Sequence, residues 1–407
     1  MKPLKVFLHD YAGHPFQAEL SRALAARGHV VTHAFFAGDP GPKGDLKAKP
    51  GDAASLSFAP IDIGVPYTKG DFIRRRFLDL RYGKAAAAAI EREKPDIVFS
   101  GNTPTEAQEA IVRAANRVGA KFVYWCQDYY SVAVSKLLTK KLGAVGALVG
   151  GYYTALERRQ MRASAAIIMI TSDFAPLARS WGVTADRLHV VPNWGPIDSI
   201  PVLPKDNAWA REHDLADKMV YLYSGTIGFK HNPELLVALA EKYRANPKVR
   251  VVVTAGGVAH KHLEERKKEL KLDNLLLLGL QPFDRFAEVL ASGDVLTAVI
   301  EHDAGAFSVP SKMLSYLCAA RPILLAAPAE NLAAKILREI NAGAVVDPDD
   351  QAGFLAAADL IANGERSETM AAAARAYAEE NFDISRVTNR IEAIFAETIG
   401  VGAKPAN

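Results

Sequence analysis

One stretch of the sequence combines glycines with a lysine in a pattern that suits phosphate binding. It follows an apolar run ending at Tyr223, and its glycines and polar residues are Ser224, Gly225, Thr226, Gly228 and Lys230. Glycine lets the backbone approach a ligand closely, and backbone N–H groups together with an ammonium group hold a diphosphate. The spacing therefore predicts a phosphate-binding loop, although an ordinary strand-to-helix turn with a lysine has the same pattern.

A second candidate for anion binding is the start of a helix near residue 311. In the segment Ser308–Tyr316, Pro310 stands where a first helical turn begins, because its ring fixes φ and it lacks an N–H group. Ser311 and Lys312 then lie at the positive end of the helix dipole, and Ser315 follows one turn later on the same face. The arrangement favours an anion; the alternative is a capped helix with a solvated lysine.

Two further candidates follow apolar strands in the first half of the chain. Gly13 and His14 come directly after the first strand and before a helix, whose N-terminal N–H groups attract anions. Asp128 ends an aromatic strand, where a carboxylate in a cleft suits a base or an orienting group. A tight turn at Gly13 with a polar turn residue at His14, and a turn cap at Asp128, are the alternatives.

The sequence lacks the motifs of several common enzyme classes. It contains no HExxH, Walker A, GxSxG, CxxC or GxGxxG pattern. Metalloproteases, P-loop NTPases, α/β-hydrolases, thioredoxins and nicotinamide or flavin enzymes are therefore not supported.

The candidate residues need a scaffold, and the hydrophobic pattern predicts alternating strands and helices. In the first half, strands are expected at Leu4–His9, Val30–Phe36, Ile97–Ser100, Phe122–Cys126, Ile167–Thr171 and His189–Pro192. Helices are expected at Phe16–Arg27, Glu106–Val118 and Tyr153–Ala163. Strands that are apolar throughout and alternate with helices indicate a parallel sheet.

The same pattern restarts after a proline-dense stretch. Strands are expected at Val220–Ser224, Val249–Ala255, Leu275–Leu278, Val295–Ile300 and Ile323–Ala326, with helices at Pro233–Tyr243, Phe283–Ala291 and Ser311–Ala319. We therefore predict an α/β protein of two doubly wound, Rossmann-like domains, residues 1–195 and 196–383, that face a cleft. Within residues 384–407, the helix expected at Ser385–Thr398 has one apolar face and should pack back on the first domain.

Composition is that of an ordinary globular protein. The 407 residues fit two or three domains, and 49% apolar with 23% charged residues exclude a disordered, collagen-like or coiled-coil chain. Cys126 and Cys318 lie in apolar runs and are expected to be reduced core thiols, which indicates a reducing compartment. The net charge of +3 argues against nucleic acid as a partner.

Charge is unevenly distributed along the chain. Residues 1–195 carry 26 basic and 17 acidic side chains, a net charge of +9, whereas the remainder carries 23 and 29, a net charge of −6. Phe72–Phe77 interleaves arginines with aromatic residues, and Lys136–Leu142 leads into Leu142–Leu156, an uncharged stretch of 15 residues that is too short to span a bilayer. We expect a cytoplasmic protein whose basic surface lies on anionic lipid; solvated helix faces over an ordinary core are the alternative.

Taken in order, these segments resemble the family-4 glycosyltransferases, retaining enzymes with the GT-B fold, and most of all their bacterial exopolysaccharide and O-antigen branch. The resemblance runs through Gly13–His29, Phe122–Tyr130, Val190–Asn193, Ser224–Gly225, Lys230, Gly256–Gly257, Leu278–Gly279 and Val309–Pro322. It implies transfer of a sugar, with retention, from a nucleotide-sugar donor to a lipid-linked or oligosaccharide acceptor. No metal or other cofactor is implied.

The resemblance also assigns residues. Lys230 falls where the family's lysine contacts the donor diphosphate, and Thr226 stands at the position of the usual arginine. The family's glutamate pair, Glu-x7-Glu, is replaced by Phe307 and Ser315, and Glu301 is a candidate for the lost carboxylate. The implied catalytic residues are His14, Asp128 and Lys230, and the implied donor-binding residues are Gly13, Ser224, Gly225, Thr226, Gly228, Glu301, Ser311, Lys312 and Ser315.

Other functions remain open at this point. A nucleotide-sugar 2-epimerase shares the two-domain fold, and a degenerate transferase that only binds would explain the missing glutamate pair. A periplasmic sugar-binding protein also has two α/β lobes, but the N-terminal apolar run is too short for a signal peptide.

Overall fold

The computed structural model describes residues 2–38, 46–65, 72–101, 103–300, 302, 311–362 and 364–400, without the side chains of Phe72, Ile73, Lys230 and Ser311. The chain divides into two compact units, one of Met1–Asn193 with Ile384–Asn407 and one of Trp194–Asp383. Each unit has its own parallel sheet and its own hydrophobic core.

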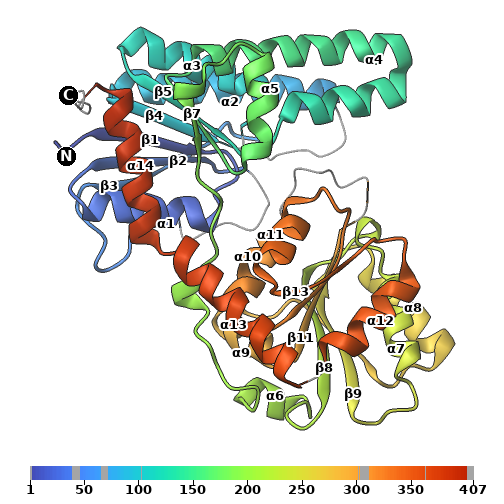
Figure 1. The fold of residues 1–407 in the computed structure, drawn as a ribbon. Coiled ribbons are helices and arrows are strands. Elements are labelled where there is room, and N and C mark those ends of the chain that lie inside the picture. The colour runs from blue at the N-terminus through green and yellow to red at the C-terminus, as the bar shows by residue number, and fades with distance from the viewer. Residues whose placement is uncertain are drawn as a thin grey trace. The chain divides into compact units, whose positions relative to one another are not determined.

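The first unit is built on seven parallel strands in the order β3-β2-β1-β4-β5-β6-β7 (Figure 1). The strands are β1 (Lys5–Asp10), β2 (Val30–Phe36), β3 (Leu56–Ile61), β4 (Ile97–Gly101), β5 (Lys121–Cys126), β6 (Ala166–Met169) and β7 (Leu188–Val190). Most are buried along nearly their whole length, which explains why they read as apolar runs. Strand β3 lies at the sheet edge and is only partly buried, so its sequence shows no such run.

Helices pack on this sheet from several parts of the chain. They are α1 (Pro15–Ala26), α2 (Phe72–Glu93), α3 (Thr105–Val118), α4 (Tyr130–Ala163), α5 (Ala175–Ser180) and α14 (Ile384–Thr398), with 3-10 turns at Ser172–Phe174 and Ala185–Arg187. Several of the side chains that helix α2 buries are small, among them Ala86, Ala87 and Ala89, so its apolar periodicity is weak in the sequence.

Helix α14 belongs to the first unit although it ends the chain (Figure 1). The ring of Phe395 packs edge-on against Phe99, with centroids 5.5 Å apart. Arg27, at the end of α1, donates to Glu392 at 2.7 Å, and His29 pairs with the same carboxylate at 3.0 Å. A buried aromatic contact and a polar cluster therefore fasten α14 to α1 and the sheet.

Helix α4 is longer than the helix expected at Tyr153–Ala163, because it already begins at Tyr130. The glycines of this region suggest breaks, yet only Gly143 departs from helical geometry, with a φ of 56° and a ψ of −130°. Among the described residues, no helix combines the length and the hydropathy needed to cross a bilayer.

The second unit has six parallel strands in the order β10-β9-β8-β11-β12-β13. They are β8 (Met219–Thr226), β9 (Val249–Gly256), β10 (Leu275–Leu278), β11 (Val295–Val299), β12 (Ile323–Ala326) and β13 (Gly343–Val346). Its helices are α6 (Ala208–Glu212), α7 (Glu234–Lys242), α8 (His260–Leu270), α9 (Phe286–Ala291), α10 (Ser311–Cys318), α11 (Leu332–Ile340), α12 (Gln351–Ile361) and α13 (Gly364–Asn381). Short 3-10 turns occur at Ile197–Ser199, Phe229–His231 and Phe283–Arg285, the last of which opens the helix expected at Phe283–Ala291.

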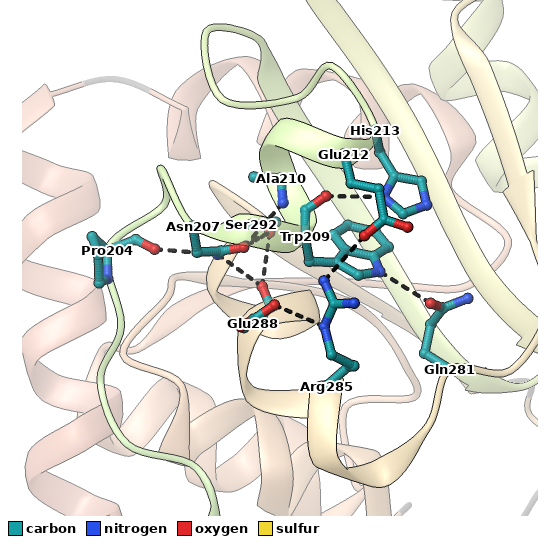
Figure 2. Close-up of polar contacts among 10 residues, drawn as sticks. All are labelled: Pro204, Asn207, Trp209, Ala210, Glu212, His213, Gln281, Arg285, Glu288 and Ser292. Atoms are coloured by element: carbon teal, nitrogen blue, oxygen red, sulfur yellow. Dashed lines mark hydrogen bonds and ion pairs between the residues drawn. The ribbon is translucent and has the colours of Figure 1, made fainter.

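A polar cluster attaches the proline-dense entry segment to the second unit (Figure 2). The Asn207 side chain accepts from the N–H of Ala210 at 3.0 Å, which caps α6, and donates to the carbonyl oxygens of Pro204 and Glu288. The indole N–H of Trp209 donates to Gln281 Oε1 at 3.0 Å. These bonds fix the start of the unit against α9 and against the loop that follows β10.

Candidate active site

The predicted anion-binding residues of the second unit meet where β8 ends and α10 begins. The Lys312 ammonium lies 3.6 Å from the centroid of the Tyr223 ring, which is a cation–π contact. Gly225 has a φ of +115°, and a Cβ atom there would lie 3.7 Å from Lys312 Cε. Two residues that the sequence singles out separately are therefore neighbours beside the carboxyl end of a central strand, where such sheets bind ligands.

Tyr316 joins the two elements that carry this pair. Its hydroxyl accepts from the N–H of Ser224 at 2.8 Å and lies 3.2 Å from the carbonyl oxygen of Thr297, to which it donates. The side chain is fully buried, so these bonds set the position of α10 relative to β8 and β11. Sequence reasoning misses Tyr316, because an aromatic residue on the apolar face of a helix reads as core.

The backbone of the glycine-containing loop is already engaged with protein groups. Three of its N–H groups have acceptors at 2.8–2.9 Å, namely Ser224 with Tyr316 Oη, Ile227 with Gly256 O, and Gly228 with His231 Nδ1. These three N–H groups are therefore not available to a phosphate in this conformation, because they bond to α10, to β9 and to the loop's own next turn. Ser224 is buried, whereas Thr226 is exposed.

Several predicted positions lie outside the described residues or atoms. They are Glu301 and Phe307 entirely, and the side chains of Lys230 and Ser311. The backbone places Lys230 in the turn Phe229–His231 and Ser311 at the first position of α10. Ser315 lies on α10 and is half-buried.

In the first unit, His14 is held by an aspartate that ends β1. Oδ1 of Asp10 lies 3.1 Å from His14 Nδ1, and the backbone N–H of His14 donates to Oδ2 of the same carboxylate. The N–H of Ala12 donates to Oδ1 at 3.2 Å. Gly13, with a φ of +76°, lets the chain turn back within this short loop. In the sequence, this pair is marked only by an aspartate four residues before a histidine, with a glycine turn between them.

This contact sets the charge of Asp10 and the tautomer of His14. Complete burial by itself raises the pKa of the Asp10 carboxyl, but the hydrogen bonds and the charge of His14 outweigh burial and hold that pKa below its ordinary value. An ionised carboxylate only accepts, so Nδ1 carries the proton, and in the neutral ring Nε2 is then an acceptor. The His14 side chain is 38% exposed and thus open to a substrate.

A buried polar network supports the end of β1 beneath this pair. His9 lies 2.9 Å from Ser100 Oγ of β4 and 2.7 Å from the hydroxyl of Tyr82 on α2. Burial lowers the pKa of His9 to about 4, so its ring is neutral near pH 7. The network ties two neighbouring strand ends together without adding charge.

Asp128 lies two residues beyond β5, on the same sheet edge as His14 and with β4 between their strands. The ring of Phe16 on α1 lies 5.6 Å from that of Trp125 on β5, so the helix that follows His14 contacts the strand that precedes Asp128. The side chain of Asp128 is exposed rather than enclosed, and partial loss of water around it raises the pKa of its carboxyl group.

Within the described residues, a possible set of metal ligands occurs at the surface of the second unit. His302, Asp347 and Asp349 bring three ligand atoms within 4.8 Å of one another. All three side chains are exposed, and His302 Nε2 lies 3.3 Å and 3.4 Å from the two carboxylates. A surface ion pair accounts for this group without a metal.

Solved structures share the architecture over nearly the whole chain. Sucrose-phosphate synthase from Thermosynechococcus elongatus is 14% identical with a TM-score of 0.74, and the match covers 98% of this chain and 99% of that one. Anabaena HepE with UDP-glucose is 14% identical with a TM-score of 0.68, covering 97% and 100%. WaaG, a glycosyltransferase involved in lipopolysaccharide biosynthesis, is 17% identical with a TM-score of 0.66, covering 96% and 99%. These matches confirm the predicted GT-B fold of two Rossmann-like units.

Sequence comparison adds the family. Residues 13–194 match the model of a glycosyl transferase 4-like domain. WcaI of Escherichia coli K12, named as a colanic acid biosynthesis glycosyl transferase, is 28% identical over 304 residues, which are 74% of this chain and 73% of WcaI. These findings indicate a glycosyltransferase and support its placement in family 4. The resemblance of its motifs to that family is thereby confirmed.

The family match divides the site residues of this glycosyltransferase into two groups. The region that matches the family model contains His14 and Asp128 and ends at residue 194, where the second unit begins. The Gly225–Lys312 contact lies beyond that region.

Proposed function

We propose that this glycosyltransferase moves a sugar from a nucleotide-sugar donor to a lipid-linked or oligosaccharide acceptor in cell-surface polysaccharide biosynthesis, with retention and without a metal ion. The names of WcaI and WaaG, and the UDP-glucose held by HepE, support this class of donor and product. The buried free thiols of Cys126 and Cys318 fit a cytoplasmic setting.

The observation that carries the proposal is the placement of Lys312 beside Gly225. Bond cleavage at the anomeric carbon leaves negative charge on a diphosphate, and a fixed cation beside it lowers the barrier. Gly225 has no side chain that would fill the space near the ammonium group. Lys312, with Lys230 as a second cation from the adjoining turn, would then bind the leaving group.

In the first unit, His14 and Asp128 would orient a sugar through its hydroxyl groups. In the neutral tautomer that Asp10 imposes, Nε2 of His14 accepts a hydrogen bond from a sugar hydroxyl. Asp128 stands on the same sheet edge and would bind a second hydroxyl. The family's glutamate pair is missing in this chain, so Ser315 or Glu301 would hold the nucleotide ribose in its place.

A thermal-shift screen with UDP-, GDP-, ADP- and TDP-sugars tests the donor site. A ligand at 100 times its Kd stabilises its unit by about 2.7 kcal/mol. Lys312→Ala should abolish that shift, whereas Lys268→Ala, an exposed lysine of α8, should keep it. In turnover assays, Lys230→Ala should lower kcat by about 10²-fold.

Turnover assays distinguish the remaining functions. Transfer to a glycan acceptor, with the anomeric configuration of the donor preserved in the NMR spectrum of the product, supports the proposal. Conversion of the donor without any acceptor would instead identify a 2-epimerase. Donor binding without turnover would indicate a degenerate transferase, for which the serine at Ser315 offers a reason.

A further inference from the structure

Helix α4 folds back on itself as a hairpin whose two halves run side by side (Figure 1). The backbone turns at Gly143, where helical geometry is interrupted. A Cβ atom at Gly146 would overlap the backbone of Leu138, and one at Gly150 would overlap Ser135. The four-residue spacing puts both glycines on one helix face, so the second half packs closely on the first through that face.

The second half turns an apolar stripe to the solvent. Val145 is 65% exposed, Leu148 77%, Val149 38% and Tyr152 48%, and Leu142 beside the turn is 57% exposed. Positions i, i+3, i+4 and i+7 form one continuous helix face. Scattered exposed apolar residues are normal in a protein, but a contiguous stripe marks a contact surface.

Cations accompany this stripe. Lys136, Lys140 and Lys141 are exposed on the first half of the hairpin. Between Tyr129 and Leu156 the sequence contains these three lysines and no acidic residue. The hairpin tip is therefore both apolar and positively charged, which is complementary to an anionic lipid surface.

The arginine-rich segment Phe72–Phe77 is less suited to that role than its sequence suggests. Arg76 Nε lies 2.6 Å from Glu106, so an acidic partner offsets one of its charges. The sequence predicts that the arginine and lysine segments together form one basic surface, and this ion pair lowers the positive charge of the arginine segment.

We propose that the α4 hairpin tip, residues 142–149 with the three lysines, inserts into the headgroup boundary of an anionic bilayer. The proposal rests on the proposed function, because a lipid-linked acceptor brings the enzyme to such a surface. The apolar side chains enter to a depth of about 5–10 Å while the lysine ammonium groups reach lipid phosphates. A second copy docked on the same stripe would bring two sets of lysines together and is disfavoured by repulsion.

Co-sedimentation of the full-length protein with vesicles tests the charge requirement. Vesicles of equimolar phosphatidylcholine and phosphatidylglycerol should bind the protein at low salt, and pure phosphatidylcholine should bind it far less. Each lysine near the surface contributes about fivefold to partitioning, so glutamine at all three tip lysines should weaken binding about 100-fold. The matched control changes Lys261, Lys267 and Lys268 of α8 to glutamine and should bind like the wild type.

Apolar insertion is tested separately. Leu148→Ser should weaken vesicle binding about tenfold, whereas Leu360→Ser, at a 56% exposed position of the second unit, should not. Leu148→Cys allows an environment-sensitive dye to be attached, because Cys126 and Cys318 are buried. Its emission should shift to the blue on anionic vesicles.

The outcomes separate the occupants of the stripe and the two proposals. A blue shift without vesicles that grows with protein concentration, with a doubled mass in light scattering, would assign the stripe to a second copy and overturn insertion. Equal vesicle binding by tip and control variants would also overturn it. If nucleotides still produce thermal shifts in the tip variants, failed insertion leaves the proposed function standing. If nucleotides produce no thermal shift in the wild type, that result counts against the proposed function alone.

Discussion

The carboxylate of Asp10 contacts the ring and the backbone N–H of His14, so its removal alters orientation and protonation together. We expect Asp10→Asn to lower kcat about tenfold with little change in the donor KM, because an amide no longer fixes the Nδ1–H tautomer. The acidic limb of the pH–rate profile should move to lower pH, since the imidazolium loses a stabilising anion. Steady-state kinetics across pH measure both effects.

Asp62→Asn is the matched control for this change. Asp62 also accepts from a backbone N–H two residues later, at 2.7 Å from Gly64, but lies in a loop beyond β3 rather than beside His14. Its kinetics should equal those of the wild type. An Asp10→Asn enzyme with normal kcat and an unmoved acidic limb would contradict the orienting role.

Gly225 and Gly228 belong to one loop but differ in conformation, which yields a paired prediction. Gly225 has a φ of +115°, whereas Gly228 has a φ of −130°, and a methyl group added at Gly228 would lie 3.9 Å or more from the nearest side-chain atoms. Gly225→Ala should therefore destabilise the second unit by about 1–3 kcal/mol, and Gly228→Ala by less than about 0.5 kcal/mol. Chemical unfolding of both variants measures the difference; equal stabilities would contradict the assigned strain.

At this scale the sequence predicts part of the site. Gly225 and Lys312 are identifiable because a glycine after a strand and a lysine at a helix start are local signals. Tyr316 and Asp10 are not, since their roles depend on contacts across elements: a hydroxyl reaching Ser224 and a carboxylate reaching back to His14. Such long-range contacts leave no spacing pattern in one sequence.

Glu157 fastens the base of the α4 hairpin to the sheet. Its carboxyl group accepts from the hydroxyl of Tyr124 on β5 at 3.0 Å and from the hydroxyl of Ser131 on the first half at 2.5 Å. Burial raises the pKa of Glu157 to about 7, although these hydrogen bonds oppose the rise. In the unfolded chain the same group loses its proton near pH 4.5, so its contribution to stability is full below that pH and is lost as pH rises towards 7.

Other buried groups of the first unit oppose or reinforce this trend. Burial lowers the pKa values of His9 and His33 to about 4, so each contributes stability above pH 6.5 that is lost as pH falls towards 4. Burial raises the pKa of Asp79 to about 7, which acts like Glu157. Between pH 5 and about pH 6.5, the effects of these two acids on the pH dependence of stability therefore nearly cancel those of the two histidines.

Glu157→Gln should upset that balance. With one acid removed, the stability of the first unit should fall by about 1 kcal/mol per pH unit on acidification from pH 6.5 to about pH 5, relative to the wild type. Urea unfolding at several pH values measures the slope. Glu265→Gln, at an exposed position of α8, serves as control, and parallel slopes for Glu157→Gln and the wild type would contradict the proton held on Glu157.

The elements themselves are predictable where one face is strongly apolar. Strands such as β2, β10 and β12 have the bounds expected from their apolar runs. The edge strand β3, the alanine-rich α2 and the first half of α4 escape the same reasoning, because partial exposure or small side chains remove the periodic signal. In α4 the glycines that suggest breaks instead permit close helix packing.

On the scale of the whole molecule, the chain crosses from one unit to the other and returns. The first unit is completed by α14, so Phe99 and Phe395, 296 positions apart in the sequence, pack against each other. The apolar face of this terminal helix predicts that it packs against another part of the protein, but the pattern does not identify which part. Ring and salt-bridge contacts with Phe99 and Arg27 supply that information.

Because the units have separate cores, a core mutation and a ligand should act on different unfolding transitions. Phe395 is fully buried against Phe99, so Phe395→Ala should destabilise the first unit by about 3–5 kcal/mol. The nucleotide found in the screen should raise only the transition of the second unit, by about 2.7 kcal/mol at 100 times its Kd. Differential scanning calorimetry resolves the two transitions, and Phe283→Ala, at a 65% exposed position, should move neither. If the mutation and the nucleotide displaced the same transition, the two units would unfold together, and the nucleotide could no longer be assigned to the second unit by its effect on stability.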